Sequence, residues 1–211
     1  NMITTYDFSK IELPIGDPLG YYVKEGNVVL ISAPHAVSQT RNGKTKFSEP
    51  QTFKLAQILQ EKTGCSVIIK TENQKDDANY YENSNYRNKI ASLIEQGKIK
   101  YVLDLHNLNF KRSQQINLGT NYGFNVVGNF TVLNRIVQIF ENNGFIVTKD
   151  FPFVAPQNTI AGFFSKNYRV FSLQIEINSG ICKTEDGINN LVDSLTEIVK
   201  SILAYEKTKK D

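Results

Sequence analysis

Residues that commonly carry chemistry are scarce in this sequence, which holds only two histidines and two cysteines among 211 residues. The cysteines, Cys65 and Cys182, do not form a CxxC pair, so we expect both thiols to be reduced and without a metal or catalytic role. No apolar run reaches the ~18 residues of a membrane helix, and no signal-like segment is present. These absences favour a cytoplasmic protein without membrane partners.

A strong charge of one sign is missing as well. The chain has 24 basic and 21 acidic residues, which gives a net charge of +3. No basic run interleaved with aromatic residues accompanies this mild charge, so nucleic acid is not an expected partner. The GxSxG elbow, the Walker loop and the dinucleotide-binding glycine pattern are also absent. The sequence therefore gives no support for serine-hydrolase, P-loop or Rossmann chemistry.

The composition is that of an ordinary globular protein, with 40% apolar and 21% charged residues. We expect one domain over residues 1–211, with an irregular segment over 1–20 and a solvated tail over 207–211. Strand-like runs alternate with amphipathic helical segments along the chain. This alternation predicts a sheet covered by helices on both faces.

The expected elements follow from apolar periodicity and from turn signals. Tyr21–Lys24 and Val28–Ala33 are expected to form an opening hairpin, and Arg41-Asn42-Gly43-Lys44 a tight type I′ turn. Ser48 and Gln51 form a possible capping box for a helix that ends near Lys62. Further strands are expected at 67–69, around His106, at 122–127, 145–147 and 170–177, further helices at 85–96, 131–142 and 186–207, and long loops at 71–86, 107–120 and 150–167.

Both histidines stand at the ends of strand-like runs. His35 follows Val28–Ala33 and Pro34, and His106 ends the run that begins at Lys100. In open α/β sheets, ligands bind beyond the carboxyl ends of the strands. A single histidine at such a place is often structural, but two on separate strands predict a shared metal ion.

Catalytic zinc sites commonly use two histidines, one glutamate and an open position. Glu49 begins a helix after the loop that leaves His35, so it is the expected third ligand. Its alternative role is to complement the helix dipole. Asp104 projects on the same side of its strand as His106, and it can either orient that histidine or bind the metal directly.

Glu176 lies in the apolar run Phe171–Asn178, where an unpaired carboxylate would be costly. Beside a zinc-activated water it could serve as the general base. The alternative is a salt bridge, for which Arg169 is the nearest candidate. Three further polar residues, Arg41, Asn79 and Arg87, are candidates for binding the carboxylate of an acidic substrate, which a planar guanidinium suits. Arg87 is favoured because it precedes an apolar helix and follows a polar loop that could fold over a site.

Taken together, several short strings resemble the N-formylglutamate amidohydrolase-like family, which is related to zinc carboxypeptidases and to succinylglutamate desuccinylase and aspartoacylase. The strings lie between residues 28 and 178; they are Ala33-Pro34-His35, Arg41-Asn42-Gly43-Lys44, Ser48-Glu49-Pro50-Gln51-Thr52, Tyr86-Arg87, Asp104-Leu105-His106 and Ile175-Glu176-Ile177. One departure is that the carboxypeptidases keep their first histidine and glutamate three residues apart, whereas His35 and Glu49 are far apart here.

The resemblance implies a phosphorylase/hydrolase-like three-layer α/β/α sandwich with a mixed, mainly parallel sheet. It also implies one zinc ion on His35, Glu49 and His106, with Glu176 as the base and Arg87 near a substrate carboxylate. The expected activity is hydrolysis of the amide bond of an N-acyl amino acid or a small acidic peptide-like substrate. Two alternatives stay open: a carboxypeptidase-like, γ-glutamyl or peptidoglycan-type peptidase with the same site, and a non-catalytic metal- or ligand-binding protein.

Overall fold

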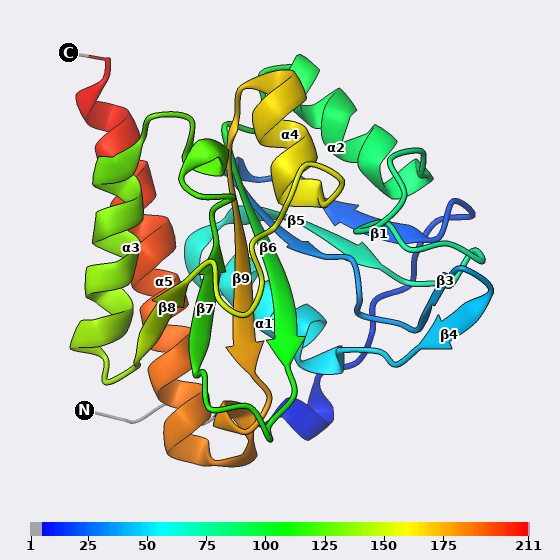
Figure 1. The fold of residues 1–211 in the computed structure, drawn as a ribbon, viewed down its shortest axis with the longest axis horizontal. Helices are drawn as coiled ribbons and strands as arrows, with labels where there is room; N and C mark the ends of the chain where they lie inside the picture. The colour runs from blue at the N-terminus through cyan, green and yellow to red at the C-terminus, as the bar shows by residue number, and fades with distance from the viewer. Residues whose placement is uncertain (1–5, 211) are drawn as a thin grey trace.

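The computed structural model describes residues 6–210, so the first five residues of the expected N-terminal segment and the last residue of the expected tail lie outside it. A seven-stranded sheet in the order β1-β5-β2-β6-β9-β7-β8 forms the centre, and β3 and β4 form a separate two-stranded sheet (Figure 1). The strands are β1 (Tyr21–Lys24), β2 (Asn27–Ala33), β3 (Gln39–Arg41), β4 (Lys44–Lys46), β5 (Cys65–Lys70), β6 (Tyr101–Leu108), β7 (Ile116–Gly119), β8 (Val147–Lys149) and β9 (Phe171–Asn178).

The sheet is mixed and mainly parallel, as the sequence predicts. β5, β2, β6 and β9 run parallel to one another. β1 is antiparallel to β5, and β7 is antiparallel to β9 and parallel to β8. Parallel strands bring their carboxyl ends to the same edge of a sheet, and this edge is where both histidines are found.

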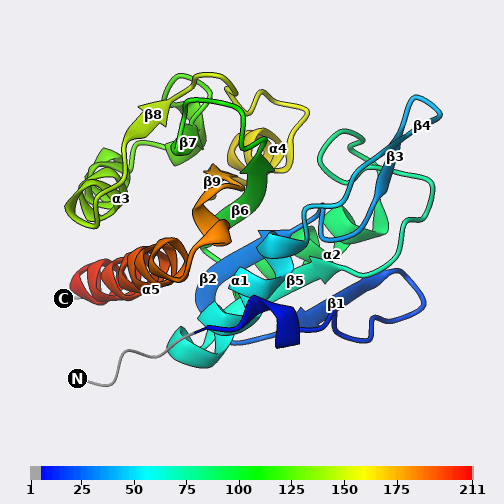
Figure 2. The same ribbon diagram turned by 90° about the horizontal axis from the view of Figure 1, so that it is seen from below.

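Helices cover both faces of the sheet and complete three layers (Figure 2). Alternation along β2 shows the division, because Ile31 belongs to one apolar cluster and its neighbour Leu30 to the other. α1, α3 and α5 pack in the first cluster, and α2 and α4 in the second. The helices are α1 (Pro50–Thr63), α2 (Asn85–Glu95), α3 (Phe130–Asn142), α4 (Ile160–Tyr168) and α5 (Glu185–Thr208).

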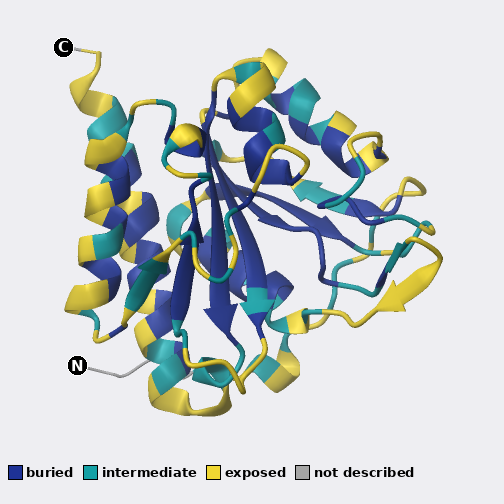
Figure 3. Ribbon diagram, viewed as in Figure 1, coloured by how far each residue is buried: buried dark blue, intermediate teal, exposed yellow. Residues whose placement is uncertain are grey.

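Burial follows the same arrangement (Figure 3). The strands at the centre of the sheet are buried on both faces. In β9 this burial includes polar side chains, among them Gln174 and Glu176, which alternate with apolar ones. The outer sides of α3 and α5 are exposed, and so is all of β4. None of the helices within residues 6–210 combines the length and the apolarity needed to span a membrane.

Two predicted features near the amino terminus differ from the structure. β1 and β2 do not pair as a hairpin; β5 lies between them and pairs with both. β1 therefore gains its partner from a strand much later in the chain, which a local turn signal cannot indicate. The capping box is absent, because Glu49 is the residue before α1 and no side chain caps that helix.

Two predictions in the second half were also wrong. Residues 122–127 form no strand; the chain instead makes a short 3-10 helix, Phe124–Val126, and the strand before it is β7. The expected loop over 150–167 contains α4, whose first turn is capped by the Thr159 side chain. The type I′ turn is confirmed, since Asn42 and Gly43 join β3 to β4 with positive φ angles of 52° and 73°.

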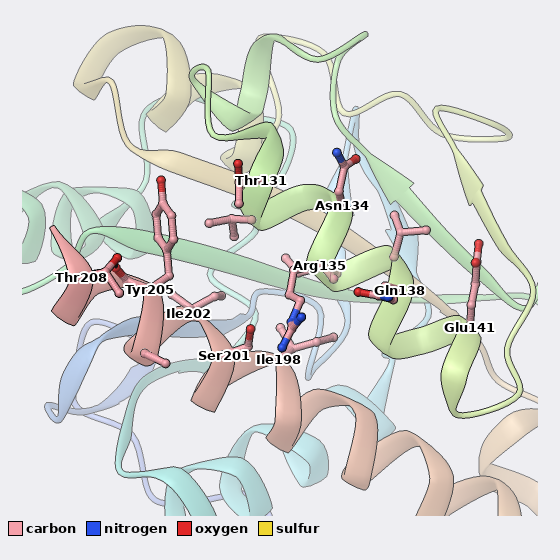
Figure 4. A pocket seen from close by; sticks show the side chains of 14 residues that line it. Thr131, Asn134, Arg135, Gln138, Glu141, Ile198, Ser201, Ile202, Tyr205 and Thr208 are labelled. Atoms are coloured by element: carbon pink, nitrogen blue, oxygen red, sulfur yellow. Dashed lines mark hydrogen bonds between the residues drawn. The ribbon is translucent and has the colours of Figure 1, made fainter.

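A hollow of about 780 Å³ lies between α3 and α5, away from both histidines. Figure 4 shows the side chains that face it from the two helices, with Arg135 extending from α3 toward α5. Its floor is the buried apolar seam between the helices, which includes Ile136 and Ile198. In the described part of the chain, no histidine or cysteine lines it.

Candidate metal centre

Three side chains from distant segments converge at the carboxyl edge of the sheet. The metal-binding atoms of His35, Glu49 and His106 all lie within 4.8 Å of one another. The two histidine Nδ1 atoms are 3.2 Å apart. The two carboxylate oxygens of Glu49 lie 3.4 Å from His35 Nδ1 and 3.5 Å from His106 Nδ1. The structure thus brings together the three residues that the sequence suggests as metal ligands.

The backbone explains why these segments meet. β2 and β6 are adjacent parallel strands in which Ser32 pairs with Asp104, so the histidines that follow lie side by side. The Glu49 N–H donates to the His35 carbonyl at 2.7 Å, which fixes the start of α1 against the end of β2. Glu49 Oε2 also accepts the Asn107 N–H at 3.1 Å.

A buried carboxylate lies behind each imidazole. Asp104 Oδ2 is 2.6 Å from His106 Nε2, and Asp77 Oδ1 is 2.8 Å from His35 Nε2. Asp104 is fully buried and also accepts the Ser32 hydroxyl at 2.7 Å, and that hydroxyl lies 2.8 Å from the Tyr86 hydroxyl. Both carboxylates are on the ring side opposite the point of convergence, which is the usual place of a residue that orients a metal-binding histidine.

The donor set fits a zinc ion. An ionised carboxylate only accepts hydrogen bonds, so each histidine must carry its proton on Nε2, facing Asp77 or Asp104. The two Nδ1 lone pairs are then available, together with the Glu49 carboxylate, to bind one metal ion. Tetrahedral zinc ligands at about 2.0–2.1 Å from the ion are about 3.3 Å apart, close to the observed 3.2 Å between the nitrogens.

The ionisation of these groups is strongly coupled. Burial lowers the pKa of His35, but the Glu49 and Asp77 carboxylates outweigh it and raise that pKa to about 9. Burial acts against Glu49 too, yet the two histidines lower its pKa to about 2. The carboxylates around the two imidazoles thus favour a positive charge at this point, carried either by a proton or by a metal cation.

Glu176 lies beside this cluster, since it pairs with His106 across β6 and β9. Its side chain is nearly buried, and Gln174 Nε2 donates to its Oε1 at 3.2 Å. Burial raises the pKa of Glu176 to about 7, against the opposing effect of the His106 charge. The alternative salt bridge to Arg169 does not form, because Arg169 lies before the start of β9 and strand residues rise about 3.3 Å each.

The cluster opens into a pocket of about 490 Å³ that Glu176 also lines. Arg41 lines it from the β3–β4 hairpin, with its guanidinium 4.5 Å above the Tyr80 ring. Asp77 Oδ2 accepts from Arg41 Nε at 3.1 Å and from Nη2 at 2.7 Å. Lys46 adds a second cation to the lining. The pocket therefore offers positive charge a short distance from the metal ligands.

The other two residues suggested for substrate binding are placed differently. Asn79 lines the pocket, but its amide is already engaged by the Ile160 N–H at 2.9 Å and by Gln174 Oε1 at 3.3 Å. Arg87 is not part of the lining; it is buried and donates to the backbone carbonyls of Ala78 and Asn158. Its role as a substrate ligand stays a prediction that this geometry does not favour.

Asp77 is the residue that sequence reasoning missed. It is fully buried and joins His35 to Arg41 through its two carboxylate oxygens. The available signal was the polar segment over 71–86, too long for a simple connection and rich in acidic residues. A histidine that binds a metal through one nitrogen usually donates its other N–H to a carboxylate, and the acidic residues of this segment are candidates for that acceptor.

Comparison with known proteins supports the fold assignment. The sequence matches no protein-family model, and no curated protein shows significant sequence similarity to it. Among solved structures, a bacteriophage poly-gamma-glutamate hydrolase matches with a TM-score of 0.57 and 14% identity, over 90% of this chain and 93% of that chain. An N-formylglutamate amidohydrolase from Ralstonia eutropha matches with the same TM-score of 0.57 and 14% identity, over 90% and 99%.

A metallo-carboxypeptidase from Burkholderia cenocepacia matches with a TM-score of 0.52 and 9% identity, over 92% of this chain and 60% of that chain. The chain therefore shares the phosphorylase/hydrolase-like α/β fold of these solved hydrolases. Within that fold it carries a candidate His-Glu-His metal site on His35, Glu49 and His106. The structural matches confirm the expected resemblance and the expected fold class, but they do not identify a substrate.

Proposed function

We propose that the protein is a zinc-dependent amidohydrolase that cleaves the amide bond of an acidic N-acyl amino acid or a small acidic peptide-like substrate. The observation that carries this proposal is the convergence of His35, Glu49 and His106 beside Glu176, at the base of a pocket lined by cations. Three protein ligands are the number found in catalytic zinc sites, whereas structural sites usually have four.

Each residue of the site would have a distinct role in the proposed hydrolysis. When bound, zinc would polarise the scissile carbonyl and lower the pKa of the attacking water. Glu176, with a pKa of about 7, would take the proton of that water and return it to the nitrogen of the leaving amine. Arg41 and Lys46 would bind the substrate carboxylate, and Asp77 and Asp104 hold the two imidazoles in the tautomer that presents Nδ1.

A peptidase acting on a longer anionic chain is the second candidate. Phe47 lines the pocket and is 96% exposed, beside Lys46 on the β3–β4 hairpin. On a second segment of the rim, Arg112 lies 5.3 Å from the centre of the Phe153 ring. Exposed aromatic and cationic side chains in and beside the pocket lining suit a substrate that extends beyond the pocket. The solved poly-gamma-glutamate hydrolase, which shares the fold, acts on a polymer.

The test is metal analysis followed by a hydrolysis screen on the zinc-loaded protein. We expect one zinc per chain and hydrolysis of N-acyl glutamates or aspartates, or of short γ-linked glutamyl peptides. Preference for peptides of three or more residues would favour the second candidate. Zinc bound without turnover of any of these amides, together with a fourth protein ligand, would favour a non-catalytic binding protein instead.

A further inference from the structure

Arg87 is a buried cation whose hydrogen bonds go to backbone carbonyls. Its side chain is only 1% exposed, and it belongs to none of the ion pairs found within residues 6–210. The guanidinium lies 5.3 Å from the centre of the Phe163 ring. Burying a charge is costly unless hydrogen bonds replace those to water, so the positions of its donors identify what Arg87 does.

Two of those donors are bound by backbone carbonyls from different loops. Arg87 Nε donates to the Ala78 carbonyl at 2.5 Å, and Nη2 donates to the Asn158 carbonyl. The backbone N–H of Arg87 donates to Ser84 Oγ at 3.1 Å, which fixes the first turn of α2. The guanidinium thus connects the loop over 71–84 to the loop over 150–159 from a rigid helix.

Both loops contribute to the pocket wall next to the carbonyls that Arg87 binds. Asn79 and Tyr80 follow the first carbonyl, while Asn158 itself and Thr159 line the wall at the second. Asn79 makes another connection, because its Oδ1 accepts the Ile160 N–H at the start of α4. The shape of this part of the pocket therefore depends on how these two loops are held together.

We propose that Arg87 is a positioning residue that holds the loops over 71–84 and 150–159 together and thereby sets the shape of the substrate pocket. This proposal rests on the proposed function only in that the pocket is taken as the substrate site. Burial lowers the pKa of Arg87 to about 10, so the guanidinium keeps its charge at neutral pH.

The metal ligands do not depend on this connection in the same way. Asp77 belongs to the loop over 71–84, but its two carboxylate oxygens are also bound by His35 and by Arg41, which lie outside that loop. Loss of the Arg87 guanidinium should therefore loosen the wall and leave the metal centre in place. Substrate binding and zinc binding should respond separately to this change.

The experiment compares Arg87→Met and Arg87→Lys with Arg135→Met, a control that removes an exposed arginine on α3. Hydrogen exchange of the zinc-loaded full chain should rise about tenfold in both loops of Arg87→Met, as expected for lost charge-assisted hydrogen bonds. Strand β6 should exchange as in the wild type, and zinc should stay at one per chain. KM should rise about tenfold with a much smaller change in kcat, and millimolar guanidinium should restore it.

Unchanged exchange in both loops of a folded Arg87→Met variant would overturn the proposal. A raised KM without faster loop exchange would also overturn it, because that result indicates direct contact with the substrate. If Arg87→Met does not fold, Arg87→Lys is decisive: intermediate exchange supports the proposal and wild-type exchange rejects it. Exchange and zinc content need no turnover, so failure of the proposed hydrolase activity is distinguishable from failure of this proposal.

Discussion

Asp77→Asn is the most direct test of the metal centre. Asp77 Oδ1 accepts the Nε2–H of His35 at 2.8 Å, and Oδ2 accepts from Arg41 at 2.7 Å. The amide of asparagine has the same shape as the carboxylate but only one accepting atom. It can satisfy either the histidine or the arginine, and its NH₂ group then faces the other donor.

The expected loss follows from these contacts. If the amide oxygen stays on Arg41, the NH₂ group forces the proton of His35 from Nε2 to Nδ1, the atom that faces the other ligands. Replacing residues that orient metal-binding histidines typically costs about 10–100-fold in metal affinity. We expect the zinc affinity of Asp77→Asn to be lower by a factor within this range. The loss should be about 10-fold if Arg41 moves aside and lets the amide oxygen accept from His35.

The assay is competitive titration of zinc against a chromophoric chelator at pH 7.5. Asp76→Asn is a matched control, since Asp76 is the preceding acidic residue and its carboxylate pairs with Lys70 at 2.9 Å instead of with a histidine. The control should keep wild-type zinc affinity. Equal affinity of the Asp77→Asn variant and the wild type would refute the view that Asp77 sets the tautomer of His35.

The remaining predictions concern catalysis and substrate binding. Glu176→Gln should keep one zinc per chain and lose roughly 10²–10⁴-fold in kcat; turnover within a few fold of wild type would remove Glu176 as the base. Because Glu176 has a raised pKa of about 7 and must be ionised to act, kcat/KM of the wild type should rise with pH up to about that value and then level off. A profile that is flat between pH 5 and 8 would contradict this assignment. At saturating zinc, Arg41→Met should raise KM for an acidic substrate about tenfold or more, and much less for the corresponding neutral amide. Equal effects on both substrates would exclude a carboxylate contact.

Much of the fold could be predicted because local patterns determine it. The helix over 186–207, the buried runs that became β6 and β9, and the turn at Asn42-Gly43 all follow from periodicity or from turn chemistry. The wrong predictions arose where distant segments decide the outcome. β1 pairs with β5 and not with its neighbour in sequence, and nothing within Tyr21–Lys24 distinguishes the two partners.

The candidate site shows the same division. Placement at strand ends was enough to group His35 with His106, and proximity to the start of a helix was enough to add Glu49. Asp77 could not be chosen among the acidic residues of its loop, because only the folded chain shows which one reaches His35. Arg87 was predicted to bind a substrate carboxylate, because its burial against two carbonyls depends on loops that are far apart in sequence and that no local pattern reveals.

The two histidines of the candidate metal centre differ in how firmly their carboxylate partners are held. His106 lies within the central strand β6 and is hydrogen-bonded to Asp104. Asp104 is bound in turn by Ser32, which contacts Tyr86, and all of these groups are buried. His35 depends on Asp77, which is also buried but comes from an irregular segment between β5 and α2. Without a metal ion, His35 and Asp77 should therefore become more mobile, whereas His106 and Asp104 should keep their positions. A metal ion would then bind first to His106 and order His35 as it completes the site.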